Sequence, residues 1–165
     1  MNKGITMKDL VAFTVAGKEY AVDMLHVIKV VKNEDIISVP ETAEYVEGVI
    51  NFNNKVVPIV NIRKKLLLQE DNVEDVRCII IVQAHGSLIG LIVDTITDII
   101  SVEDNDIMPP DELLKDATYL VGMIKKEDDM ILVMEAEKLV AEDKTAIEYV
   151  RGKVEIRKHP AESEE

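Results

Sequence analysis

Three histidines and one cysteine are the side chains of this chain with the greatest capacity for nucleophilic, acid–base or metal chemistry. His26, His85 and His159 are scattered along the sequence and have no metal-ligand spacing. His85 precedes a glycine in an expected turn, where a solvated histidine is favoured over a ligand. Cys78 opens the apolar run Cys-Ile-Ile-Ile-Val, so we expect a small buried hydrophobe and not a nucleophile.

The glycines and acidic residues also form no reactive or phosphate-binding pattern. None of the seven glycines belongs to a G-x-G-x-x-G or Walker sequence. Residues 104–106, Asp-Asn-Asp, begin like a calcium loop but lack its glycine and closing glutamate. Asp23 and Asp94 recur at equivalent places in two similar stretches, and we expect them to cap turns. We therefore predict a protein that is not an enzyme, with no catalytic residue, metal site or cofactor.

The charge balance and composition restrict the class of protein. Of 165 residues, 19 are Lys or Arg and 32 are Asp or Glu, which gives a formal net charge of −13. Such an acidic chain disfavours nucleic-acid binding, because phosphates are neutralised by basic side chains. No apolar stretch approaches the roughly 20 residues of a membrane span, and the start lacks the apolar region of a signal peptide. A lone cysteine fits a reducing compartment, so we expect a soluble cytoplasmic protein without membrane insertion.

The elements that position these residues are predicted to be strands, arranged in two similar copies. The chain contains 22 valines and 20 isoleucines, which pack well on pleated sheets and lose side-chain freedom in helices. Residues 45–50 are similar to 119–124, and residues 20–23 are similar to 91–94. Polarity agrees along both stretches, so two similar lobes are the favoured interpretation.

Each copy is predicted to contain two strands, a polar segment with proline, a hairpin and a short helix. The ranges are 10–15, 20–23, 46–60 and 61–67 in the first copy, and 78–82, 88–94, 120–134 and 135–142 in the second. Short strands between turn residues favour small β-barrels over a parallel βαβ sheet. The polar residues 69–75 are a candidate link between the lobes. Because two lobes enclose a cleft, binding is favoured over catalysis.

Several of these segments together resemble the signatures of the CheW-like chemotaxis coupling proteins. The central one is Val-Glu-Gly-Val-Ile-Asn at 46–51, followed by Val-Val-Pro-Ile-Val-Asn-Ile-Arg at 56–63. Further landmarks stand in the family's order at 13–15, 19–23, 90–94 and 119–122. The resemblance covers about residues 8–143, and four weak motifs in register make it specific.

The resemblance implies a mainly β fold of two SH3-like five-stranded β-barrel lobes with short helices, between which strands can be exchanged. The lobes would occupy residues 8–143, followed by an extension at 144–157 that could be helical and a disordered tail at 158–165. It also implies a non-catalytic adaptor that couples the regulatory domain of the histidine kinase CheA to the cytoplasmic tips of methyl-accepting chemotaxis receptors. Such a protein is expected in the cytoplasm, at membrane-associated receptor arrays.

The resemblance also places two contact sites on the chain. The kinase contact is expected at Glu47, Gly48, Val49, Gly90 and Leu91. Without a Cβ, each glycine could let a partner strand approach, and its replacement by a bulky charged residue would then weaken kinase binding but leave the fold intact. Alternatively each glycine only relieves a β-bulge. The sequence leaves both interpretations open.

Receptor binding is expected in an apolar groove between the lobes, where a helical receptor tip could dock. The apolar residues at the matching positions are Met24, Val27, Val30, Cys78, Ile96 and Ile99. Some of them, Ile96 in particular, could instead belong to a core between the lobes.

Two further positions of the receptor site depart from the family's usual pattern. Lys29 stands where glutamate is common, and Asn53 stands where arginine is common. An acid and a base expected to face one another have therefore both changed. One alternative function is a module that binds another helical or barrel-like partner. Another is a small-ligand sensor that uses the cleft, which a lining of Val, Ile and Met disfavours.

Overall fold

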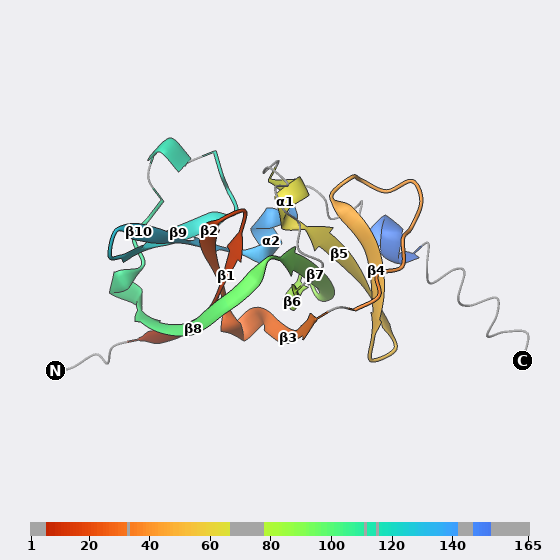
Figure 1. Cartoon of the computed structure of the whole chain (residues 1–165), viewed down its shortest axis with the longest axis horizontal. Coiled ribbons are helices and arrows are strands. Elements are labelled where there is room, and N and C mark those ends of the chain that lie inside the picture. The colour runs from red at the N-terminus through yellow and green to blue at the C-terminus, as the bar shows by residue number, and fades with distance from the viewer. Residues whose placement is uncertain are drawn as a thin grey trace, which may run out of the picture.

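The structure, a computed structural model, describes residues 6–32, 34–66, 78–110, 112–114, 116–141 and 147–152. Within these residues the chain forms two five-stranded sheets, one in each lobe (Figure 1). Lobe A contains, in spatial order, β8 (Thr95–Glu103), β1 (Met7–Val15), β2 (Lys18–Asp23), β10 (Asp129–Met134) and β9 (Leu120–Lys126). Lobe B contains β3 (Val27–Lys32), β6 (Cys78–Ala84), β7 (Ser87–Val93), β5 (Lys55–Asn61) and β4 (Val46–Phe52). The mainly β fold with two five-stranded lobes is therefore confirmed.

Short helical segments connect or follow these strands. They are η1 (Met24–His26), α1 (Ile62–Lys65), η2 (Asp104–Asp106), η3 (Glu112–Leu114) and α2 (Ala136–Leu139). The helices α1 and α2 lie inside the ranges predicted for them, and each follows the second strand of a hairpin. The tip of the β4–β5 hairpin is Asn53-Asn54, with φ angles of 49° and 63°. Asparagine tolerates this left-handed conformation, which tight hairpin turns require.

The two sequence copies do not coincide with the two lobes. The opening hairpin of each copy belongs to a sheet whose remaining strands come from the other copy. The hairpin β1–β2 pairs with β8 and β10, while the hairpin β6–β7 pairs with β3 and β5. The β2–β10 and β5–β7 pairs join strands of different copies and are parallel, whereas the other pairs are antiparallel. Each lobe thus needs both copies to complete its sheet.

This exchange explains why β1 and β6 are apolar on both faces. In β1, Leu10 and Ala12 face the core of lobe A, while Val11 and Phe13 face a second cluster that both lobes contribute to. We call this second cluster the shared core. In β6, Ile80 lies in the shared core and its two isoleucine neighbours lie in the core of lobe B. Because side chains alternate along a strand, an unbroken apolar run supplies two cores.

The chain returns to lobe B after α2. Residues 147–152 are helical, Ile147 is buried in the shared core, and Val150 is buried with Val46 and Val49 of β4. The expected tail at 158–165 and the expected link at 69–75 lie outside the described residues, as does the end of the proposed extension. In the described part of the chain, no helix has the length and apolar character needed to cross a membrane.

Candidate protein-interaction site

The apolar residues expected to bind receptors gather around the shared core. Met24, Val27, Val30 and Ile96 are half-buried and pack against it, and they come from η1, β3 and β8. β3 and β8 are the outer strands of their sheets, so the shared core reaches the surface between elements of different lobes. Cys78 is buried inside this core.

Large apolar side chains also project into solvent from the same three elements. Leu25 of η1 is 87% exposed, Ile28 of β3 is 46% exposed, and Ile99 of β8 is 56% exposed. Sequence reasoning selected Ile99 but missed Leu25 and Ile28. The sequence pattern that could have identified Leu25 and Ile28 is the largely apolar run Met-Leu-His-Val-Ile-Lys-Val-Val at 24–31. Its apolar residues lie on both faces of an outer strand. We call Leu25, Ile28 and Ile99, together with the half-buried Val27 and Val30, the η1–β3–β8 surface.

Lys29 reaches the hairpin that carries Asn53. The Lys29 ammonium lies 6.0 Å from the centre of the Phe52 ring, at the distance limit of a cation–π contact. Phe52 is the last residue of β4, and Asn53 follows it in the turn. β3 and β4 are the two ends of the lobe B sheet, so this contact also shows how strongly the sheet curls. Positions 29 and 53 therefore lie in one region of lobe B.

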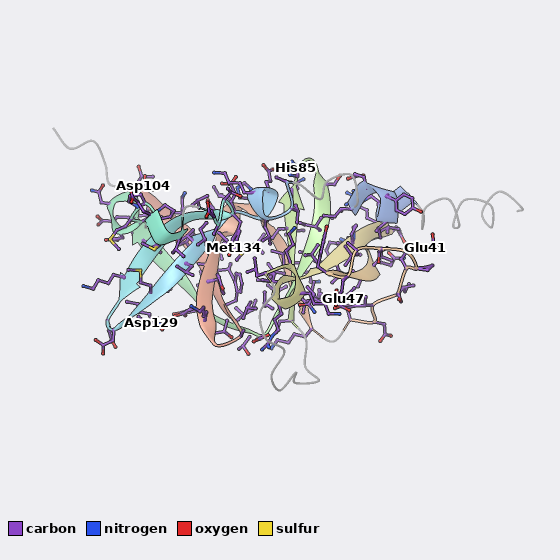
Figure 2. The ribbon with its side chains drawn as sticks, turned by 90° about the horizontal axis from the view of Figure 1, so that it is seen from above. Glu41, Glu47, His85, Asp104, Asp129 and Met134 are labelled. Carbon is purple, nitrogen blue, oxygen red and sulfur yellow. The ribbon has the colours of Figure 1, made fainter. Side chains whose placement is uncertain are left out.

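The residues expected to contact the kinase are mostly enclosed by their own chain. The Glu47 carboxylate accepts a hydrogen bond from the Asn61 amide at 2.9 Å and pairs with the Lys64 ammonium at 2.8 Å. These contacts connect β4 to the start of α1. Glu47 is labelled in lobe B in Figure 2. The side chains of Val49 and Leu91 are buried in the hydrophobic cores.

Gly48 is required by the packing of its own chain. Its φ is +146°, and the pairing register shifts between Val46 and Gly48, as in a β-bulge. A Cβ added there would overlap the Ile37 carbonyl oxygen and would lie 2.8 Å from the Ile37 carbonyl carbon, whereas Cβ atoms in proteins keep at least 3.0 Å from such atoms. The bulge interpretation is therefore confirmed at Gly48. The expectation that a bulky charged residue would leave the fold intact is wrong, because the main chain of Ile37 occupies that space.

Gly90 is enclosed in a different way. A Cβ at this position would lie 2.5 Å from the Ile59 Cδ1 methyl and 2.8 Å from the Ile79 Cγ2 methyl, both in the core of lobe B. The missing side chain thus makes room for two isoleucines of the same chain. A bulky charged residue here would have to displace these core side chains, so we expect it to disturb the fold as well.

The candidate reactive groups serve structural roles in the described residues. Asp23 accepts the Leu25 N–H at 2.9 Å and so caps η1, as expected. His85, labelled in Figure 2, is exposed in the β6–β7 turn. It contacts Glu137 of α2. Within the described residues no three His, Cys, Asp or Glu side chains gather as metal ligands. His159 lies outside these residues.

Two tyrosines meet beside the shared core. Burial raises the pKa of the Tyr20 phenol, and the neighbouring Tyr119 raises the pKa of Tyr20 further. Burial likewise raises the pKa of Tyr119. An apolar environment disfavours the phenolate, so both side chains stay neutral at ordinary pH.

Comparison with known proteins identifies the family. Residues 9–144 match the model of the CheW-like domain. The chain is 33% identical over 128 residues to Chemotaxis protein CheW of Bacillus subtilis, covering 77% of this chain and 82% of that protein. It is 28% identical over 136 residues to Chemotaxis protein CheW of Treponema pallidum, covering 79% of this chain and 80% of that protein.

A solved structure agrees with the sequence comparison. The scaffolding protein TtCheW from Thermoanaerobacter tengcongensis superposes with a TM-score of 0.76 at 32% identity, covering 81% of this chain and 92% of that one. The fold of this chain is thus shared with a solved scaffolding protein of similar sequence. The chain belongs to the CheW-like domain family of chemotaxis scaffolding proteins.

Proposed function

We propose that this protein is a non-catalytic adaptor that couples the histidine kinase CheA to the cytoplasmic tips of chemoreceptors, at receptor arrays in the cytoplasm. The observation that carries the proposal is the η1–β3–β8 surface, where large apolar side chains project from both lobes. Exposed apolar groups concentrated on a few elements are typical of protein-interaction sites. Membership of the CheW-like family supports CheA and chemoreceptors as the proposed partners.

The receptor tip is proposed to dock on the η1–β3–β8 surface. A receptor tip is a helical hairpin, and an amphipathic helix can place its apolar side chains between Leu25, Ile28 and Ile99. Of the residues proposed from the sequence, Val27, Val30, Met24 and Ile96 form the half-buried floor of this site. Cys78 supports the floor from within the shared core.

The kinase regulatory domain is proposed to bind lobe B beside β4. Glu47, Gly48, Val49, Gly90 and Leu91 would shape this region by holding neighbouring residues in place. The neighbouring residue proposed to contact the kinase is Ile37, whose side chain is 59% exposed. Its main chain exchanges hydrogen bonds of 2.8 and 2.9 Å with Val49. Gly48 would then influence the kinase contact through Ile37.

Reciprocal surface variants test both contacts. We expect Leu25→Asp to weaken binding of a receptor-tip fragment more than about tenfold, because a charge enters an apolar interface. The same variant should bind the kinase regulatory domain normally. Ile37→Asp should show the reverse, and Met130→Asp on β10 is a control in which an exposed apolar residue elsewhere is charged. Isothermal titration calorimetry measures each affinity, and unchanged receptor binding by Leu25→Asp would contradict the placement of the receptor site.

A double-mutant cycle tests the polar part of the receptor site. Asn53→Arg alone would place two cations near one another and should not improve receptor binding. Lys29→Glu alone should help little, whereas the double variant rebuilds an acid–base pair worth about 0.2–1 kcal/mol. Position 53 is left-handed, but any strain from arginine is common to the single and double variants and cancels in the cycle. Zero coupling would mean that the two positions do not communicate and would contradict this placement of the groove.

A further inference from the structure

Two hairpin turns, one in each lobe, are held by carboxylates in the same way. The β1–β2 turn at Ala16-Gly17 and the β6–β7 turn at His85-Gly86 share a left-handed backbone. In each turn the first residue donates its backbone N–H to a carboxylate. The Ala16 N–H binds Asp94 Oδ2 at 2.9 Å, and the His85 N–H binds Glu137 Oε1 at 3.1 Å.

The Asp94 carboxylate connects the two lobes. Asp94 stands between β7 of lobe B and β8 of lobe A. Arg63 of α1, which follows β5 of lobe B, donates from Nε to Asp94 Oδ1 at 2.9 Å and from Nη2 to Oδ2 at 2.6 Å. The carboxylate therefore binds an arginine of lobe B and the Ala16 turn of lobe A together. The Arg63 and Asp94 side chains are only 14% and 30% exposed, so solvent weakens this two-point contact less than it would at an open surface.

The Glu137 contact joins the lobes in the opposite direction, because its carboxylate comes from lobe A and the turn that it holds belongs to lobe B. Glu137 lies in α2, directly after β10 of lobe A, and His85 lies in the turn of the lobe B hairpin β6–β7. Besides the carboxylate contact, the backbone carbonyl of Glu137 lies 3.0 Å from His85 Nε2. Glu137 is the counterpart of Arg63 when residues 45–50 are aligned with 119–124. The repeat has thus produced two inter-lobe contacts with different side chains.

We propose that Asp94 and Glu137 are positioning residues that hold the lobes in one mutual orientation. The shared core consists mainly of aliphatic side chains, whose attraction is non-directional. Hydrogen bonds to charged groups have defined directions and add a preferred orientation. β3 and β8 belong to different lobes, so the same contacts determine the shape of the η1–β3–β8 surface. This last consequence rests on the proposed function.

Pulsed electron–electron double resonance on the free protein tests the proposal. Spin labels at Lys18→Cys in lobe A and Lys55→Cys in lobe B report the inter-lobe distance, with Cys78→Ala as the background. We expect one narrow distance distribution in the background protein. The double variant Asp94→Ala, Glu137→Ala should broaden or shift it.

The matched control is Glu19→Ala. Glu19 of β2 binds Thr97 of β8 and Lys126 of β9, all within lobe A. This variant should leave the inter-lobe distance unchanged. Arg63→Lys, which keeps the charge but loses the two-point geometry, gives a milder perturbation if the double variant folds poorly. A distribution unchanged in both the double variant and Arg63→Lys would overturn the proposal.

Receptor affinity is measured separately on the same variants. We expect the double variant to bind a receptor-tip fragment about tenfold more weakly, within the usual range of positioning effects. The label distance is obtained without any partner, so its result does not depend on the identity of that partner. A broadened distribution with unchanged receptor affinity would overturn the consequence for the η1–β3–β8 surface.

Discussion

Replacement of Gly48 by alanine is predicted to damage lobe B severely, despite the small size of the added methyl group. The residue has a φ of +146°, which L-amino acids with a Cβ rarely adopt. The new Cβ would meet the carbonyl of Ile37, a main-chain group that cannot rotate away as a side chain could. Relief of this clash requires the segment at Ile37 to leave β4.

The magnitude follows from two contributions. Backbone strain at such a φ costs about 1–3 kcal/mol. Separation of Ile37 from β4 also removes its two hydrogen bonds with Val49, each worth about 1 kcal/mol. We therefore expect Gly48→Ala to lower the free energy of unfolding by about 3–5 kcal/mol, a large share of the stability of a typical domain.

The matched control is Gly122→Ala at the equivalent position of β9. A Cβ there would meet a methyl group of Ile107, with the Met108 carbonyl oxygen at 3.2 Å, and Gly122 has no positive φ. Overpacking against a side chain typically costs about 1–3 kcal/mol. Urea denaturation followed by circular dichroism measures both variants. A loss of less than about 1 kcal/mol in Gly48→Ala, or a Gly122→Ala variant that is the less stable of the two, would contradict this expectation.

Three further predictions concern buried groups. Because the pKa values of Tyr20 and Tyr119 are raised, the unfolded chain loses phenolic protons at lower pH than the folded chain, so the free energy of unfolding should decline from about pH 10 upward. Absorbance titration at alkaline pH should show both tyrosines ionising at higher pH than an exposed tyrosine. The variant Tyr119→Phe should remove one of these two ionisations. Val150→Asp, at a side chain 1% exposed against β4, should cost more than about 3 kcal/mol in urea denaturation, and a loss below about 1 kcal/mol would mean that the helix at 147–152 does not support lobe B. Cys78 should react with an aromatic disulfide reagent only after unfolding, and rapid reaction in the native protein would contradict its burial.

The sequence predicts the local elements well, because each depends on neighbouring residues. Asn53-Asn54 indicates a left-handed hairpin tip, and the β-branched runs indicate strands. The exchange of hairpins could not be predicted from the apolar pattern. The run at 78–82 shows that both faces of β6 are buried, but it does not tell which lobe covers which face.

The candidate site was predicted only in part, for related reasons. Position along the chain led to Met24, Val27 and Cys78, yet exposure depends on how the strands pair, and the neighbour that is mostly exposed is Leu25. The requirement for glycine at position 48 comes from a carbonyl eleven residues earlier in the chain, which no local pattern reveals. Long-range packing, and not residue type, decides which of these side chains are exposed and where a glycine is required.

Assembly of the three components together tests the central claim most directly. The chain, a CheA regulatory domain and a receptor cytoplasmic fragment can be mixed in all combinations and analysed by sedimentation velocity. We predict that the chain binds each partner alone and that all three sediment together, because the two contacts are proposed at different exposed residues, Leu25, Ile28 and Ile99 for the receptor and Ile37 for the kinase. Failure to bind either partner, or binding in which one partner displaces the other, would contradict the proposal that this protein is the adaptor between them.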